Sequence, residues 1–168
     1  DGAALRLNAM AHRNDVPDRD VEQYERWGFA SSFVMGLGSE TRVSINLLHH
    51  QDDNIPEYGL PYFASYGGRL PGVDRESYFG YANVDTQEIE ATTLTGILEH
   101  DFSDKANLRT LARVQRVDQL SIVSPTQGTW CLDSGINPAT GATCSAPGTY
   151  LPSGPRGTSR DTRNGLAV

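Results

Sequence analysis

The sequence contains no long hydrophobic run, and this absence excludes one class of membrane protein. No stretch of about 18 consecutive apolar residues occurs in the chain, so no transmembrane helix is predicted. The strands of a transmembrane β-barrel alternate apolar and polar residues and therefore escape a search for apolar runs. The absence of such a run excludes a helical membrane protein but does not exclude a transmembrane β-barrel.

An excess of positive charge is missing too. The chain has 14 Lys and Arg residues against 21 Asp and Glu residues, which gives a net charge of −7. The basic residues form no continuous stripe, so a nucleic acid is not an expected partner. The 17 Gly and 9 Pro residues suit strands that are joined by irregular loops. The chain also lacks an initiator Met and a signal peptide and begins within an alternating segment, so we expect a fragment.

Catalytic signatures are also missing. The chain has no G-x-S-x-G sequence, no phosphate-binding glycine loop and no zinc-ligand spacing. Glu88 and Glu90 share one face of a predicted strand, as a pair of glycosidase carboxylates would, but no other catalytic feature accompanies them. His49 and His50 are adjacent and point to opposite faces of a strand, which is unfavourable for sharing one metal ion. We predict neither enzymatic activity nor a metal site.

The sequence does contain regular alternation of apolar and polar residues. Residues 29–37 and 43–47 alternate in this way on either side of a short turn, which predicts a β-hairpin. Similar alternation predicts further strands, with a sixth beginning near Thr158. The five complete predicted strands are Ala3–Arg13, Arg26–Leu37, Thr41–Gln51, Glu88–Phe102 and Asn107–Val117. Their lengths are close to the roughly 9–11 residues that a tilted strand needs to cross a bilayer.

The connections between these predicted strands alternate between long and short. Residues 38–40 and 103–106 form short turns, whereas residues 14–25, 52–87 and 118–157 form long loops. Loops longer than about 12–15 residues are uncommon in compact domains, but outer-membrane barrels combine short turns at one end with long extracellular loops at the other. We therefore predict an all-β fold: an antiparallel, up-and-down segment of a transmembrane β-barrel.

The two faces of the predicted strands differ as a barrel wall requires. The residues expected to face lipid are Phe29, Phe33, Met35, Val43, Ile45 and Leu47. The residues expected to face a wet lumen are Arg6, Asn8, Arg42, Asn46, Arg109, Arg113 and Gln115. Trp27 and Phe29 near a long loop, and Phe102 near a short turn, are expected to form aromatic girdles at the membrane interfaces. The fourth strand alternates more weakly, because Leu94 and Leu98 share a face with Glu88 and Glu90.

Five or six strands do not close a membrane barrel, since the smallest single-chain barrels have about eight. An open apolar sheet with two bare edges would aggregate, so we expect the chain to be part of a larger barrel. Two alternatives remain open. One is a passive porin-like or adhesin-like barrel segment, and the other is a soluble secreted β-sandwich that serves as a binding module.

Several segments resemble the barrel domain of TonB-dependent siderophore receptors, particularly the catecholate siderophore receptors of Gram-negative bacteria. They include "AHRNDVPDRDVEQYERWGFA", "QDDNIPEYGLPYF", "LPGVDRESYFGYANVDTQEIE", "LEHDFSD", "RVQRVDQLSIVSPTQGTWC" and "SGPRGTSRDT". The resemblance implies a 22-stranded outer-membrane barrel with an N-terminal plug, which imports ferric siderophores with energy passed on by TonB. It implies that residues 1–168 are part of the barrel domain, without the plug or the segment that contacts TonB. The iron would arrive inside the siderophore, so no cofactor of the protein is expected.

The same resemblance makes the aromatic residues of the long loops candidates for ligand binding. A ferric catecholate is aromatic and anionic, so Tyr and Trp rings can stack on it and Arg can pair with its charge. The predicted ligand-binding residues are Arg13, Arg26, Trp27, Tyr58, Tyr62, Phe63, Tyr66, Arg69, Arg75, Tyr78, Tyr81 and Trp130. The alternative is that these rings pack the loop against itself and its neighbours.

The two cysteines lie within the last long loop. Cys131 and Cys144 enclose 12 residues rich in turn formers, "LDSGINPATGAT". Because the periplasm is oxidising, we predict a disulfide between them on the extracellular side, with two free thiols as the alternative. Closing a loop of this size stabilises the folded state by roughly 3 kcal/mol in the chain-entropy model.

Overall fold

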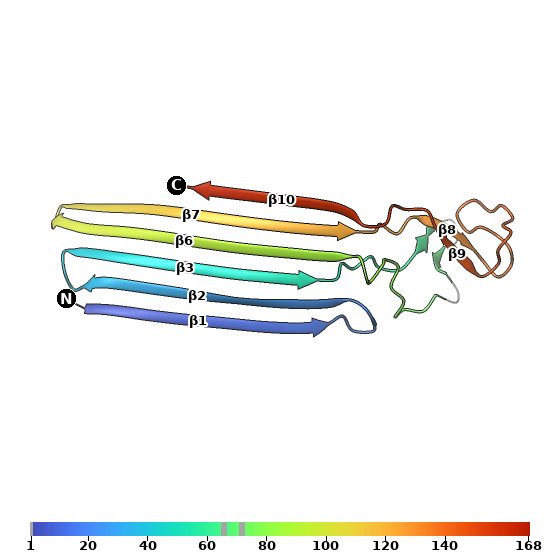
Figure 1. Ribbon diagram of the computed structural model, residues 1–168, viewed down its shortest axis with the longest axis horizontal. Coiled ribbons are helices and arrows are strands. Elements are labelled where there is room, and N and C mark those ends of the chain that lie inside the picture. Colours follow the sequence, from blue (N-terminus) through green and yellow to red (C-terminus); the bar gives the residue numbers. More distant parts are fainter. Residues whose placement is uncertain (1, 65–66, 71–72) are drawn as a thin grey trace.

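Six antiparallel strands form one open sheet, and each pairs with the next one along the chain (Figure 1). The computed structural model describes residues 2–64, 67–70 and 73–168. The sheet consists of β1 (Gly2–Asp15), β2 (Gln23–Leu37), β3 (Thr41–Asn54), β6 (Thr86–Ser103), β7 (Ala106–Val123) and β10 (Thr158–Ala167). Two small hairpins lie in the long connections: β4 (Tyr62–Phe63) with β5 (Gly68–Arg69), and β8 (Gly128–Cys131) with β9 (Thr149–Pro152). The described residues form no helix that is long and apolar enough to cross a membrane.

The predicted order of strands is confirmed, but most of the predicted ends were wrong. β7 continues to Val123 instead of Val117, β3 continues to Asn54 instead of Gln51, and β6 begins at Thr86. The alternation fades before the strands end: the face of β7 that carries Val114 next carries charged residues, while pairing with β6 and β10 continues. The long connections are correspondingly shorter and comprise residues 16–22, 55–85 and 124–157.

The register brings the apolar residues of successive strands onto one face of the sheet. Leu5 lies opposite Phe33, and Phe33 lies opposite Ile45. Leu47 lies opposite Leu94, which in turn lies opposite Val114. Residues opposite each other share a face and side chains alternate along a strand, so the predicted lipid-facing set lies on this single face. We call it the apolar face. Leu94 and Leu98 of β6 lie on it, opposite Leu47 and Val43, although the alternation of β6 in the sequence is weak.

The opposite face of the sheet is held by polar side-chain contacts between strands. Ser32 Oγ donates a hydrogen bond to Asn46 Oδ1 at 2.5 Å, and Arg113 Nε donates one to Thr95 Oγ1 at 3.0 Å. Arg42 Nε donates to Glu99 Oε2 at 2.8 Å. The predicted lumen residues Arg42, Asn46 and Arg113 therefore share a face with one another and not with the apolar residues.

Aromatic clusters lie on the apolar face toward both ends of the sheet. Near the long connections, the ring of His49 lies 5.0 Å from that of Trp27 and 5.5 Å from that of Phe29. Near the short turns, the rings of His100 and Phe102 are 4.4 Å apart. On β3 the two clusters are separated by about 27 Å along the strand, close to the roughly 25 Å height of the apolar band of membrane barrels.

The tight turn between β2 and β3 depends on glycine. Gly36 has a φ of 81°, and a Cβ atom there would collide with the carbonyl oxygen of Thr41. Ser39 Oγ donates a hydrogen bond to Gly36 O at 2.8 Å, which closes the turn. The turn fixes the register of the hairpin and, with it, the face on which the apolar residues lie.

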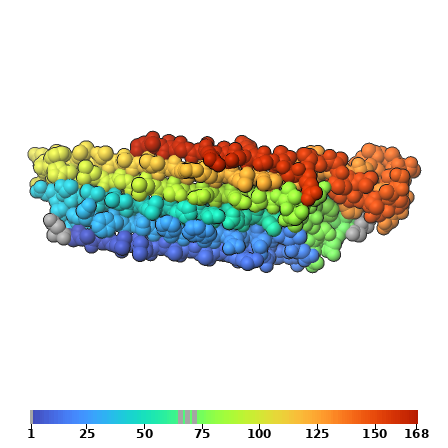
Figure 2. All heavy atoms as spheres, in the orientation of Figure 1, coloured from blue at the N-terminus to red at the C-terminus, as the bar shows by residue number. Residues whose placement is uncertain are grey.

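Most of the buried residues lie outside the sheet, in the three connections at one of its ends (Figures 1 and 2). We call these connections, residues 16–22, 55–85 and 124–157, the cap. The described buried residues of the cap are Glu22, Leu70, Val73, Asp85, Ser124, Cys131 and Pro138. On the sheet, by contrast, Leu94 is 49% exposed and Val114 is 60% exposed. The cap thus has a small core of its own.

Candidate ligand-binding site in the cap

The carboxylate of Asp85 joins the two longest connections of the cap. Its Oδ1 accepts a hydrogen bond from Ser124 Oγ at 2.5 Å, and its Oδ2 accepts from Tyr78 Oη at 3.1 Å and from the Tyr81 backbone N–H at 2.8 Å. The Ser124 N–H in turn donates to Tyr58 Oη at 2.6 Å. Asp85 is only 4% exposed, so a buried carboxylate with uncharged hydrogen-bond donors holds residues 55–85 against residues 124–157.

Burial also sets the protonation of the tyrosines around this carboxylate. Burial, followed by the negative charge of Asp85, raises the pKa of Tyr78 far above its ordinary value. Burial raises the pKa of Tyr58 as well, although its hydrogen bond with the Ser124 backbone opposes this shift. Both hydroxyls therefore stay protonated at neutral pH, and Tyr78 remains a donor to Asp85.

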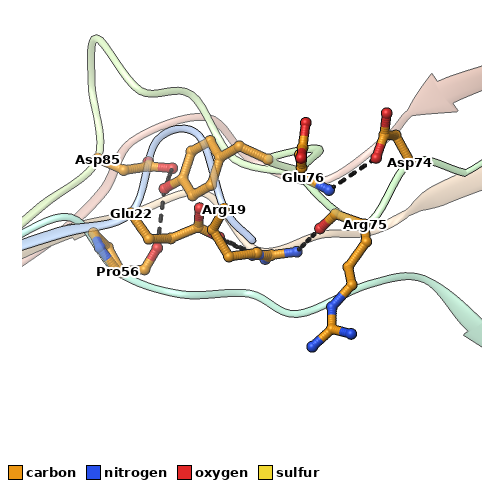
Figure 3. A network of polar contacts seen from close by, with 8 residues as sticks. Arg19, Glu22, Pro56, Asp74, Arg75, Glu76 and Asp85 are labelled. Carbon is orange, nitrogen blue, oxygen red and sulfur yellow. Dashed lines mark hydrogen bonds and ion pairs between the residues drawn. The ribbon is translucent and has the colours of Figure 1, made fainter. Parts of the chain in front are cut away.

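The short connection packs against the same part of the cap through Arg19, which also forms a buried ion pair within the connection (Figure 3). Arg19 Nε donates a hydrogen bond to Glu22 Oε1 at 2.8 Å, and the exposed fractions of the two side chains are 6% and 0%. Arg19 also donates through Nη1 to the backbone oxygen of Arg75 at 3.0 Å. Residues 16–22 are thereby fixed to residues 73–77, and the three connections form one packed unit.

Three aromatic rings from two connections gather beside this unit. The ring centroids of Phe79 and Trp130 are 6.3 Å apart, those of Phe79 and Tyr150 are 6.0 Å apart, and those of Trp130 and Tyr150 are 5.6 Å apart. Trp130 and Tyr150 face each other across the β8–β9 hairpin. Together with Tyr78 and Tyr81, the three rings line a cleft of about 420 Å³, which we call the ring cleft.

A second cleft adjoins the ring cleft. It has a volume of about 460 Å³ and is lined by Leu60, Tyr62, Phe63 and Gln127, among others. Tyr150 lines both clefts, as does Gln127. Both volumes lie within the roughly 300–1,000 Å³ of ordinary small-molecule sites, so the pair has room for a ligand of moderate size.

The predicted ligand residues of the cap are partly brought together. Tyr78, Tyr81 and Trp130 line the ring cleft, and Tyr62 and Phe63 line its neighbour. Tyr58 instead contacts the Asp85 network, with its ring 5.7 Å from that of Tyr78.

The remaining predicted cap residues lie apart from the clefts or outside the description. Arg75 is exposed and its Nε lies 3.7 Å from Asp18 Oδ2, at the surface of the cap. The backbone of Arg69 pairs with that of Tyr62 in the β4–β5 hairpin, but its side chain lies outside the described part of the chain. Tyr66 also lies outside the described residues.

Three predicted ligand residues belong to the sheet and not to the cap. Arg26 Nε lies 3.6 Å from Asp52 Oδ1, and Arg13 lies opposite Glu25 in the β1–β2 ladder. Trp27 belongs to the aromatic cluster on the apolar face, which is the position expected for a girdle residue. Contact of these three residues with a ligand stays a prediction.

Sequence reasoning did not include Phe79, Tyr150 and Arg156 among the binding residues. The guanidinium of Arg156 lies over the ring of Tyr81, 4.7 Å from its centroid. The predicted disulfide between Cys131 and Cys144 brings their two segments together, but it does not single out Tyr150, which lies beyond Cys144 and pairs with Trp130 in the β8–β9 hairpin. Phe79 belongs to the concentration of aromatic residues in its loop, but nothing distinguishes it from the other rings there, and nothing in the local sequence marks Arg156.

The structure joins Cys131 and Cys144 in a disulfide, with the two Cα atoms 5.9 Å apart. Cys131 is 3% exposed and ends β8, directly after Trp130. The disulfide closes residues 132–143 onto the β8–β9 hairpin. In the described part of the chain no group of three His, Cys, Asp or Glu side chains is placed to hold a metal ion, and the absence of a resident metal stays a prediction.

Comparison with known proteins identifies relatives of the chain. No protein-family model matches it. It is 33% identical over 127 residues to the probable TonB-dependent receptor BfrD of Bordetella pertussis, a match that covers 72% of this chain and 17% of BfrD. It is 31% identical over 139 residues to the catecholate siderophore receptor Fiu of Escherichia coli, covering 76% of this chain and 18% of Fiu. The crystal structure of the ferric-catecholate import receptor Fiu of Escherichia coli K12 in its open form matches with a TM-score of 0.75 and 26% identity, covering 99% of this chain and 26% of that chain.

The six-stranded meander, its apolar face and these matches define a segment of a β-barrel receptor. More particularly, the chain belongs to the TonB-dependent siderophore receptors. It spans about a fifth of the length of the curated relatives it matches. The predicted total of 22 strands stays a prediction.

Proposed function

We propose that the chain is part of an outer-membrane receptor of a Gram-negative bacterium that binds ferric catecholate siderophores and imports them with energy from TonB. Residues 1–168 belong to the barrel domain in this proposal, and the apolar face contacts lipid. A plug and the segment that contacts TonB belong to the rest of the receptor. The iron is cargo inside the siderophore, and the chain carries out no chemical reaction and needs no cofactor. The names of Fiu and BfrD support this assignment.

The observation that carries the proposal is the convergence of aromatic rings from two connections on the ring cleft. Phe79 comes from residues 55–85, whereas Trp130 and Tyr150 come from residues 124–157. Ring faces of this kind stack on the rings of catechols, and each such contact contributes about 0.5–1.5 kcal/mol. Arg156, over Tyr81, adds a positive charge near the cleft for an anionic complex.

The two alternatives explain less of the molecule. A passive porin-like segment accounts for the sheet but not for a cap with a buried core and a cluster of rings. A soluble sandwich requires a second layer over the apolar face, and within the described residues Leu94 and Val114 remain about half exposed. A transport receptor with a binding cap accounts for both the sheet and the cap.

The test uses the full-length receptor in a strain that lacks its own catecholate receptors. Trp130→Ala combined with Tyr150→Ala is expected to weaken uptake of radiolabelled ferric catecholate about tenfold or more, because two stacking contacts are lost. Phe33→Ala, on the apolar face, serves as the control and is expected to leave uptake nearly unchanged. Normal heat-modifiable mobility on gels verifies that each variant assembles.

Two results would contradict the proposal. Wild-type uptake by the assembled double variant would mean that the ring cleft binds no substrate. Uptake that persists after deletion of TonB would favour the porin-like alternative. Loss of uptake with retained surface binding after that deletion supports an energised receptor.

A further inference from the structure

The charge of the cap is opposite to what an anionic ligand alone would favour. Carboxylates outnumber arginines two to one in residues 16–22, 55–85 and 124–157. The acidic residues are Asp18, Asp20, Glu22, Glu57, Asp74, Glu76, Asp85 and Asp133, and the basic residues are Arg19, Arg69, Arg75 and Arg156. Arg19 is neutralised by Glu22, and Arg75 lies beside Asp18. The cap therefore favours positive charge on a ligand.

The ring cleft itself also favours a positively charged ligand group. Among its described lining residues, Asp74 carries the only charged side chain. Asp74 Oδ1 accepts a hydrogen bond from the backbone N–H of Glu76 at 3.1 Å, which fixes the carboxylate at the rim of the cleft (Figure 3). The carboxylate of Asp85 lies behind the lining, because Tyr78 and Ser124 both line the cleft and both donate to it. The cleft thus has one carboxylate at its rim and another beneath its wall.

The rings of the cleft are suited to a positive charge as well. The face of an aromatic ring carries negative electrostatic potential, and it attracts cations within about 6 Å of the centroid. Tyr81 already receives the guanidinium of Arg156 in this way. Within the described part of the chain, no cationic side chain lies over the rings of Phe79, Trp130 or Tyr150. Each of these three side chains is only half-buried, so each presents ring surface to the cleft.

We propose that the ring cleft binds an organic ammonium group, either a protonated amine or a quaternary ammonium, carried by the ligand. The inference rests on the proposed function, since the ammonium group would be an arm of a ferric siderophore complex. Three rings and the Asp74 carboxylate surround the group, and desolvation in the cleft strengthens its attraction to the ring faces. The receptor then selects complexes that carry such an arm over complexes of the same size that are anionic throughout.

The test compares two ferric catecholate complexes that differ in a single atom of one arm. One carries a trimethylammonium arm and the other a tert-butyl arm, which has nearly the same shape but no charge. Titration calorimetry on the purified full-length receptor is expected to give about five- to tenfold tighter binding of the ammonium complex. This preference is expected to shrink as salt is raised, because part of it is electrostatic.

Three substitutions assign the preference to the cleft. Asp74→Asn removes the charge at the rim with little change in shape, and Trp130→Leu removes one ring; each is expected to reduce the preference to about twofold or less. Glu76→Gln is the matched control, because Glu76 is an exposed neighbour of Asp74 that does not line the cleft. It is expected to retain the full preference.

Equal binding of the two arms by the wild type would overturn the inference, as would a preference that survives both Asp74→Asn and Trp130→Leu. A parent complex without either arm separates this inference from the proposed function. Binding of the parent without any preference between the arms would leave the proposed function in place and refute the ammonium site. Failure of the parent to bind, with a clear preference between the arms, would refute the proposed substrate and support the ammonium site.

Discussion

The sheet and the cap are stabilised by different surroundings although one chain alternates between them. The sheet presents large apolar side chains such as Ile45, which is 45% exposed, and has almost no buried residues of its own. The cap buries Leu70, Val73 and Cys131, together with hydrogen-bonded groups such as Asp85. In the proposed receptor, lipid and the rest of the barrel cover the sheet, whereas the cap buries its core by itself.

This difference means that the two regions respond to different kinds of change. In the sheet of the proposed receptor, the face on which a side chain lies decides the effect of a substitution, because the apolar face would meet lipid and the other face carries polar contacts. In the cap, hydrogen bonds and packing decide the effect, as in a small water-soluble domain. Substitutions made in one region at a time in the full-length receptor test whether the two regions respond separately.

The largest effect is expected from a charge on the apolar face. Ile45→Arg places a cation near the middle of the apolar band, where it costs about 2–4 kcal/mol, and we expect assembly to fail. Asn46→Arg, the next residue and on the opposite face, is expected to assemble. Heat-modifiable mobility on gels and recovery in the outer-membrane fraction measure assembly. Assembly of Ile45→Arg with failure of Asn46→Arg would mean that the two faces are reversed.

A slightly smaller effect, confined to the cap, is expected from loss of the disulfide. Replacing Cys131 and Cys144 by Ser removes a constraint of roughly 3 kcal/mol from the cap. Amide hydrogen exchange in residues 128–152 is expected to accelerate, while exchange in β2 and β3 is expected to stay slow. Reduction of the wild type is the control and should reproduce the result. Faster exchange throughout the sheet would show that the two regions do not unfold independently.

Next in size is the loss of one acceptor in the buried network. Asp85→Asn keeps the shape of the side chain but replaces one accepting oxygen with a donor, which leaves Tyr78 or Ser124 without its partner at a cost of about 2 kcal/mol. We expect faster proteolytic cleavage within the cap and unchanged assembly of the barrel. Glu57→Gln, an exposed carboxylate of the same connection, is the control. Equal protease resistance of the two variants would mean that Asp85 does not hold the connections together.

The smallest effect is expected from alkaline pH. Burial raises the pKa of Tyr78, so this residue stays protonated in the folded cap where the unfolded chain begins to lose its proton, near pH 10. The stability of the cap is therefore complete below about pH 10 and falls above it, by at most about 1.4 kcal/mol per pH unit for this one group. Protease resistance of the cap between pH 8 and pH 11 measures the fall. Tyr78→Phe is expected to reduce the pH dependence, and an identical dependence in that variant would exclude Tyr78 as the cause.

The sheet was largely predictable from the sequence because the period of a strand is fixed by backbone geometry. Phe33 and Ile45 belong to alternating runs separated by a short turn, and that pattern is sufficient to place them on one face. The strand ends were not predictable in the same way. Beyond Val114 the same face of β7 carries Arg116 and Asp118 while the other face carries Val117, so apolar residues no longer keep to one face although the ladder continues.

The site was only partly predictable because it depends on packing between distant segments. The abundance of rings in residues 55–85 was visible, but the place of Phe79 beside Trp130 and Tyr150 arises from contact between two separate connections. The role of Asp85 was not predictable either, since a single aspartate has no local signature that marks it as buried. Composition indicates the chemistry of such a site, and only the tertiary contacts identify which rings take part.

The hydrogen bonds of Asp85 and of Arg19 run between parts of the cap, and the described hydrogen bond from the Ile55 N–H to Gln23 O meets the sheet at the first residue of β2. The three connections of the cap can therefore be transferred together to a related barrel. Exchanging all three connections together between related receptors preserves both the strand register below and the buried network above, whereas exchanging one connection alone separates Arg19 from Arg75 or Asp85 from Ser124. Recombination in nature and loop grafting in the laboratory face the same constraint: new ligand specificity is acquired most safely when the three connections are transferred as a set.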